Sequence, residues 1–93
     1  MKKDYDPYDN FRWSILKNSK LKDIRGVGFE EILKEEYLGA LEHPQRKNQR
    51  LLLFLYNEYV WVVPCIIEDE YVFLKTLFPS SKYTKLYSKG ELA

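Results

Sequence analysis

The segment LLLFLYNEYVWVVPCII, residues 51–67, decides the fold. It holds two runs rich in aliphatic, β-branched and aromatic residues, and only Asn57 and Glu58 separate them. Two residues between two such runs predict a β-hairpin, although Asn-Glu is a weaker turn signal than Asn-Gly. Pro64 has no N–H to donate to a neighbouring strand, so we expect the second strand to be an edge there or to carry a bulge.

Both faces of this hairpin are predicted to be apolar. The residues that alternate along the first strand are Leu51, Leu53 and Leu55 on one side and Leu52, Phe54 and Tyr56 on the other. A sheet with one face in water would alternate more cleanly between apolar and polar residues. We therefore expect either that helices of this chain cover both faces or that a second protein chain covers one of them.

The sequence after the hairpin predicts a turn, a strand and a short helix. Residues 68–70 (EDE) form the expected turn, and YVFLKTLF, residues 71–78, forms the expected strand, which Pro79 ends. Ser80 or Ser81 can then cap a short helix in SKYTKLY.

Two helices and a short strand are predicted before the hairpin. Ser14 can cap a helix over ILKNSKLKDIR, which ends at Gly26. Acidic residues at positions 30 and 31 favour the start of a second helix, which we expect to end before Gly39. Both glutamates are interpreted as solvated. LGALEHP, residues 38–44, reads as a strand.

Helices followed by strands predict one α+β domain over residues 1–93. We expect two N-terminal helices packed on a four-stranded antiparallel meander, then a short C-terminal helix, with residues 1–10 as a flexible arm. The single cysteine, Cys65, excludes an internal disulfide and fits a reducing compartment. No apolar run approaches the roughly 18 residues of a membrane span, and no signal segment is visible, so a soluble, cytoplasmic protein is expected.

Charge is uneven along the chain although the formal net charge is only +1. Residues 46–50 carry +3, residues 51–74 carry −4 and residues 75–93 carry +3. Two basic segments therefore flank an acidic middle, and they would form a phosphate-binding patch if the fold brings them together.

Few residues are suited to catalysis. His43, the only histidine, lies at a predicted strand end, where it is either a general acid or base or a surface turn residue. One histidine and one cysteine make a zinc site improbable, and GVGFEE lacks the strand and third glycine of a dinucleotide loop. The basic and hydroxyl residues near the two segments remain as candidates: Arg46, Lys47, Arg50, Lys75, Ser80, Ser81, Lys82, Thr84 and Lys85. They are either solvated charges with a helix cap, or a grip for phosphate.

FRWSILKNSKLKDIRGVGFEEIL resembles the opening of BrnT-type toxins, and HPQRKNQRLLLF with VVPCIIEDEYVFLKTLFPSSKYTK resembles a branch of small bacterial toxin-like proteins. The endings of that branch carry a Pro-Ser-Arg-Lys-Ala-Thr-Lys motif. Lys82, Thr84 and Lys85 match its basic and hydroxyl positions. Ser81 stands where the motif has arginine and Tyr83 where it has alanine, and lysine does not replace the bidentate fork of an arginine.

The resemblance implies a RelE-like fold and a metal-independent endoribonuclease that needs no cofactor. It also implies that an antitoxin protein silences the enzyme. In such an enzyme the 2′-hydroxyl of the RNA attacks the adjacent phosphate. His43 would transfer a proton, Arg50, Lys75, Lys82 and Lys85 would stabilise charge, and the remaining candidates would bind RNA. The partners expected are the antitoxin and RNA, ribosome-associated mRNA included, with assembly as a homodimer or a hetero-oligomer. The alternatives are a protein-binding module that has lost cleavage and an RNA-binding protein without cleavage.

Overall fold

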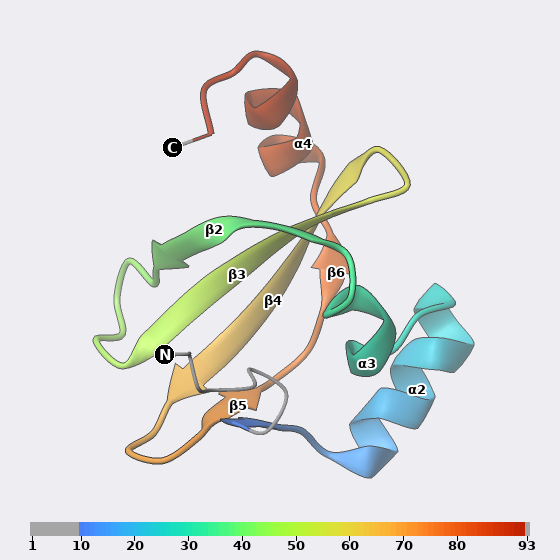
Figure 1. Ribbon diagram of the computed structural model, residues 1–93, viewed down its shortest axis with the longest axis vertical. Coiled ribbons are helices and arrows are strands. Elements are labelled where there is room, and N and C mark those ends of the chain that lie inside the picture. Colours follow the sequence, from blue (N-terminus) through green and yellow to red (C-terminus); the bar gives the residue numbers. More distant parts are fainter. Residues whose placement is uncertain (1–9, 93) are drawn as a thin grey trace.

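The hairpin predicted from residues 51–67 lies at the centre of a six-stranded mixed sheet (Figure 1). In the computed structural model, which describes residues 10–92, β3 (Gln49–Tyr56) pairs antiparallel with β4 (Tyr59–Ile67). Asn57 and Glu58 have φ values of 53° and 64°, as the two central residues of a type I′ turn require. The two-residue hairpin is thus confirmed.

The rest of the sheet differs from the simple meander that we expected. The strand order is β1-β5-β4-β3-β2, and β6 pairs with β4 as well. The further strands are β1 (Phe11–Arg12), β2 (Glu36–Glu42), β5 (Val72–Leu74) and β6 (Phe78–Pro79). β1 runs parallel to β5 and every other pair is antiparallel, so the domain is α+β but its sheet is mixed. The predicted arm at residues 1–10 lies, except for Asn10, outside the described residues.

A single strand over residues 71–78 is wrong, because β5 and β6 pair with different parts of β4. The Lys75 N–H donates to the Pro64 carbonyl (2.9 Å). The Pro64 carbonyl therefore points toward the residues that link β5 to β6. A residue in a strand directs its nitrogen and its carbonyl to the same neighbour, so the missing N–H of Pro64 falls where β5 ends and β6 has not begun. Pro64 therefore occupies a local edge, as its chemistry demands.

The first helix is confirmed and the second is shorter than predicted. In α2 (Ile15–Arg25), Ser14 Oγ accepts from the Lys17 N–H (3.1 Å), and Gly26 ends the helix with φ 84°. The next helix, α3 (Phe29–Ile32), has only four residues, and β2 begins at Glu36. The Tyr37 ring packs on the Phe54 ring with centroids 5.4 Å apart, so strand pairing overrides the helical spacing there.

Helices of this chain pack on both faces of the sheet. The first face carries α2 and α3, whose buried Leu21, Phe29 and Ile32 form one core cluster with Phe54, Trp61, Val63, Cys65 and Leu74. The second face carries α4 (Ser81–Ser88), where Tyr83 packs against a cluster of Leu53, Val60 and Val62. α4 lies at the hairpin end of β4, so the helices within residues 10–92 cover only part of the second face (Figure 1).

Candidate functional site

The predicted site residues fall into two groups at different places along β4. The loop group surrounds the connection between β2 and β3 and the end of β5; its members are His43, Arg46, Lys47, Arg50 and Lys75. The helix group begins α4; its members are Ser80, Ser81, Lys82, Thr84 and Lys85. The connection and α4 lie at separate corners of the molecule (Figure 1).

Gln49 joins four members of the loop group. Its carbonyl accepts hydrogen bonds from the His43 N–H (3.1 Å) and from Arg50 Nη1 (3.0 Å). Its own N–H donates to the Arg46 carbonyl (3.3 Å), and its side-chain Oε1 accepts from Lys75 Nζ at 3.5 Å. Gln49 is only 8% exposed; its backbone bonds to the loop and its side-chain amide bonds to Lys75 at the end of β5.

The loop leaves one nitrogen of His43 for chemistry. His43 Nδ1 accepts the Gln45 N–H (3.1 Å), so the neutral ring carries its proton on Nε2. Arg50 Nη1 also donates to the Lys47 carbonyl at 3.0 Å, which bends the guanidinium back over the loop. Residues 42–47 line an open hollow of about 460 Å³. A ring fixed through Nδ1 can exchange a proton only through Nε2.

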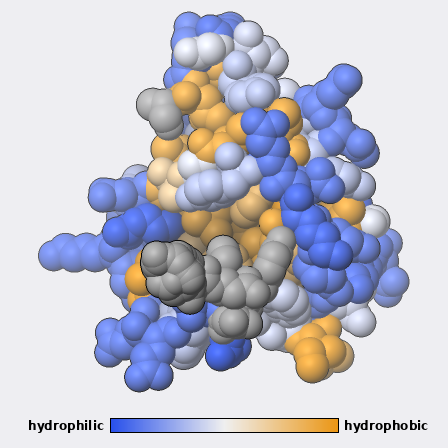
Figure 2. All heavy atoms as spheres, in the orientation of Figure 1, coloured by the Kyte–Doolittle hydropathy of each residue, from blue (hydrophilic) through white to orange (hydrophobic). Residues whose placement is uncertain are grey.

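The loop group is electropositive. Within residues 10–92, Arg46, Lys47, Arg50 and Lys75 form no ion pair. Hydrophilic side chains project from the loop on the left of Figure 2. One carboxylate lies among them, because Glu42 is the cross-strand partner of Arg50 and lines the same hollow. The cations outnumber it, and an excess of cations attracts a polyanion.

Arg50 and Lys75 nevertheless point to opposite faces. Arg50 is the cross-strand partner of Cys65 on the first face, and Lys75 continues the ladder opposite Pro64 on the second. Burial raises the pKa of the Cys65 thiol, more than the nearby Arg50 lowers it. Cys65 is therefore the buried, unreactive residue that its sequence context predicts.

The hydroxyls of the helix group hold α4 in place. Ser80 Oγ accepts the N–H three residues further on (3.1 Å), which is the predicted cap. Ser81 Oγ and the Tyr59 hydroxyl are 2.8 Å apart. Thr84 Oγ1 accepts the Val60 N–H (2.8 Å) and donates to the Ser80 carbonyl (2.6 Å). All three side chains thus have structural partners.

The two groups do not meet at one phosphate. The Ser80 N–H bonds to the Val60 carbonyl and the Lys75 N–H bonds to the Pro64 carbonyl, so their attachments to β4 are four residues, or about 13 Å, apart. Lys82 and Lys85 are exposed on α4, and Lys82 Nζ lies 5.3 Å from the Tyr83 ring centroid. The structure brings His43, Arg46, Arg50 and Lys75 together around Gln49 and leaves the lysines of α4 apart.

Part of the second face near Lys75 was missed by sequence reasoning. Cross-strand pairs define two rows there, which we call the open rows: Arg12, Phe73, Ile66 and Gln49 in one, and Lys75, Pro64, Leu51 and Leu41 in the other. Directly paired residues project from the same face. The rows could not be read from the sequence because they depend on which strands are neighbours.

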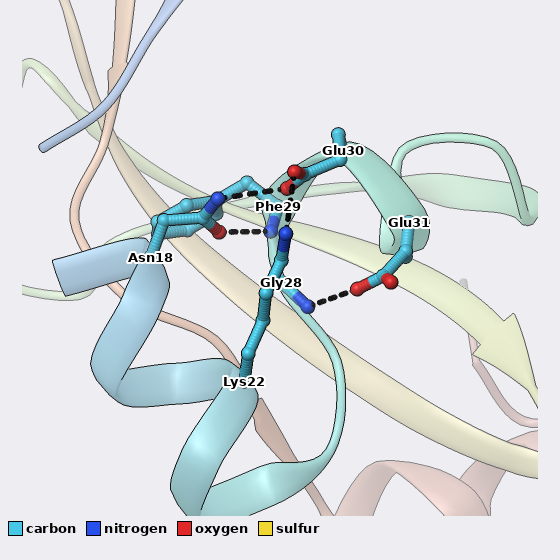
Figure 3. Close-up of polar contacts among 6 residues, drawn as sticks. All are labelled: Asn18, Lys22, Gly28, Phe29, Glu30 and Glu31. Carbon is cyan, nitrogen blue, oxygen red and sulfur yellow. Dashed lines mark hydrogen bonds and ion pairs between the residues drawn. The ribbon is translucent and has the colours of Figure 1, made fainter. Parts of the chain in front are cut away.

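A polar network between α2 and α3 was also missed (Figure 3). Glu30 is not merely solvated: it accepts from Asn18 Nδ2 and forms an ion pair with Lys22, both at 2.8 Å. The hydrogen bond from Lys22 is the main cause that lowers the pKa of Glu30 to about 2. Glu31 Oε1 accepts the Gly28 N–H at 2.5 Å. The spacing of Gly28 and Glu31 was the available signal, because an acidic residue at this position can bond back to the start of a helix.

No protein-family model, curated protein or solved structure matches this chain. Among residues 10–92, no helix is long and apolar enough to cross a membrane. Nor does this part of the chain gather three or more His, Cys, Asp or Glu side chains that could hold a metal ion.

Proposed function

We propose that this chain is a metal-independent endoribonuclease of the toxin type, which an antitoxin protein neutralises. One observation carries the proposal: a single buried residue, Gln49, is hydrogen-bonded to the backbone of His43 and Arg46 and to the side chains of Arg50 and Lys75. These residues supply a proton-transfer group and three cations at one end of the sheet. The resemblance of the chain to BrnT-type toxins supports the same class of activity.

The reaction would use the 2′-hydroxyl of the RNA itself. Its oxygen forms a bond to the adjacent phosphorus while the bond from phosphorus to the 5′ oxygen breaks, which leaves a 2′,3′-cyclic phosphate and a 5′-hydroxyl. A base removes the 2′-hydroxyl proton and an acid supplies a proton to the 5′ oxygen. His43 Nε2 is the candidate for proton transfer. Lys75 is the candidate for stabilising negative charge on the phosphorane, and Arg50, which projects from the opposite face, would bind the RNA backbone beside it.

The remaining cations have a different role in this proposal. Lys82 and Lys85 are too far along β4 to share a phosphate with Lys75, so they would bind the RNA backbone at another nucleotide. Arg46 and Lys47 lie on the exposed loop and would do the same on the other side. Such contacts add affinity that depends on salt but no sequence preference.

A binding module without cleavage is the second candidate, and the helix group favours it. Ser81 replaces the arginine of the family motif, and its hydroxyl lies 2.8 Å from that of Tyr59. Ser80 and Thr84 are likewise bonded within the fold. In this candidate the fold binds a partner protein or RNA without cutting RNA.

The decisive experiment expresses the chain alone and together with the product of the neighbouring open reading frame. The endoribonuclease predicts growth arrest by the chain alone, relief by co-expression, and RNA fragments with 2′,3′-cyclic ends in the presence of EDTA. Harmless expression together with a stable complex would instead select the binding module.

A further inference from the structure

The open rows form a patch of the second face that combines apolar, aromatic and cationic side chains. Phe73 and Lys75 are two residues apart on one stretch of chain and project from the same face, about 7 Å apart along the strand direction. Arg12 is the cross-strand partner of Phe73. The side chain of Gln49 is uncharged. The eight residues of the rows include no carboxylate, and Lys75 supplies a cation on this patch.

The helices of the described chain lie elsewhere. α2 and α3 belong to the cluster of the first face, and α4 packs over Val60 and Val62 at the other end of the second face. Ile66 and Phe73 are apolar and half-buried, yet they belong to neither core cluster. They are cross-strand partners of each other and lie outside the two clusters that hold α2, α3 and α4 on the sheet.

The cation Lys75 and the aromatic ring of Phe73 together indicate which kind of molecule binds this patch. A row of strand residues with an aromatic ring beside a cation is the arrangement on which single-stranded nucleic acid binds, since the base stacks on the ring while its phosphate meets the cation. A second copy of this chain seated on the same patch would bring the Lys75 ammonium groups of the two protomers into one interface. Like charges make that pairing unfavourable.

We propose that Phe73 stacks a base of single-stranded RNA on the open rows and that Lys75 contacts the phosphate next to that base. The inference rests on the proposed function and adds to it the substrate class and a positioning residue. A base in a duplex is stacked on both sides and hides its face, so the site takes unpaired RNA. Phe73 would thereby hold the strand in register with the loop group beside it.

Binding is measured with a short single-stranded RNA that carries 2-aminopurine at one position and 2′-O-methyl groups, which prevent attack by the 2′-oxygen. The base fluoresces less when it stacks, so the wild-type chain should quench it at one position along the strand. Phe73→Leu should lose the quenching and bind roughly tenfold more weakly. Phe73→Tyr keeps a ring and should retain both.

The salt dependence separates the two residues. Phe73→Leu should leave the slope of log affinity against log salt unchanged, because stacking releases no counterions. Lys75→Gln should lower the magnitude of that slope by about 0.7. Tyr87→Leu, which removes an exposed ring on α4, is the matched control and should change neither affinity nor slope. Thermal unfolding of each variant shows whether it is folded.

Each failure has a distinct meaning. If the wild-type chain binds no RNA, both the proposed function and this inference fall. If it binds RNA but Phe73→Leu binds equally well without loss of quenching, the inference falls and the proposed function stands. Equal competition by duplex RNA would also overturn it. So would self-association that Phe73→Leu abolishes while RNA binding persists, because a second copy would then occupy the face.

Discussion

The side-chain oxygen of Asn18, in the middle of α2, accepts a hydrogen bond of 2.7 Å from the N–H of Phe29, the first residue of α3. Its amide nitrogen donates to Glu30 at 2.8 Å. A helix of four residues cannot satisfy its own first N–H groups, so α2 supplies the cap that α3 lacks. The two helices therefore cover the first face as one unit.

Asn18→Ala should destabilise the protein by about 1–3 kcal/mol, because it leaves the buried Phe29 N–H without an acceptor. The measurement is urea unfolding followed by circular dichroism. Ser19→Ala, the exposed neighbour on α2, is the control and should change the free energy of unfolding little. Equal stabilities for the two variants would contradict the capping role.

Gly28→Ala should destabilise the protein by about 1–3 kcal/mol through crowding and not through backbone strain. An added Cβ would lie 2.7 Å from Lys22 Cε and closer still to Asn18 Oδ1, while the φ of Gly28 is an ordinary −112°. The loss should shrink in the Asn18→Ala background, since the oxygen in the way is gone. An undiminished loss would place the cause elsewhere.

The protein should lose stability in acid because Glu30 becomes protonated there. Its pKa is lowered to about 2 in the fold, against an ordinary value of 4.5, so its contribution is full above 4.5 and is lost as the pH falls toward 2. Thermal midpoints of Glu30→Gln should fall less over that interval than those of the wild type. The side chain is 42% exposed, so the difference should be small and should weaken with salt. Glu35→Gln, at an exposed position, serves as control. If the thermal midpoint of Glu30→Gln falls with pH as steeply as that of the wild type, Glu30 is not the group responsible.

Thr84→Val should loosen α4. It removes the acceptor of the Val60 N–H and the donor to the Ser80 carbonyl while it keeps the shape of the side chain. We expect a loss of about 1–3 kcal/mol and faster amide exchange at Val60. Thr84→Ser retains the hydroxyl and should keep the slow exchange. Fast exchange in both variants would mean that the hydroxyl is not what protects this amide.

Lys75→Ala should reduce RNA cleavage on the order of 100-fold if Lys75 stabilises the phosphorane. The double variant Lys82→Ala/Lys85→Ala should mainly weaken RNA binding, and its cleavage at saturating RNA should stay near that of the wild type. Lys89→Ala, at the end of α4, is the charge-matched control. A loss of turnover in the α4 double variant with normal turnover in Lys75→Ala would move the reaction centre to α4.

The elements that depend on interactions between residues close together in sequence were predicted correctly. Ser14 and Gly26 mark the ends of α2, Asn57-Glu58 marks the hairpin, and Ser80 caps α4. Each signal acts over a few residues, so the sequence contains it in full.

Features that depend on distant partners were not predictable in the same way. Tyr37 entered a strand because Phe54 lies across from it, and β5 and β6 separated because they pair with different stretches of β4. The candidate site shows the same division. Its residue types were visible in the sequence, but the role of Gln49 and the separation of Lys75 from Lys82 come from register.

The parallel pairing of Arg12 with Phe73 delays assembly of the molecule. During synthesis on the ribosome, the first strand emerges early and has no partner until the chain has been translated past position 73. The N-terminal helices must also wait for β4 before they can bury their apolar side. Contacts between residues far apart in sequence form late, which slows folding and leaves apolar segments exposed to water until then. A nascent chain stalled before Phe73 would therefore be a substrate for chaperones and proteases rather than a partly working protein.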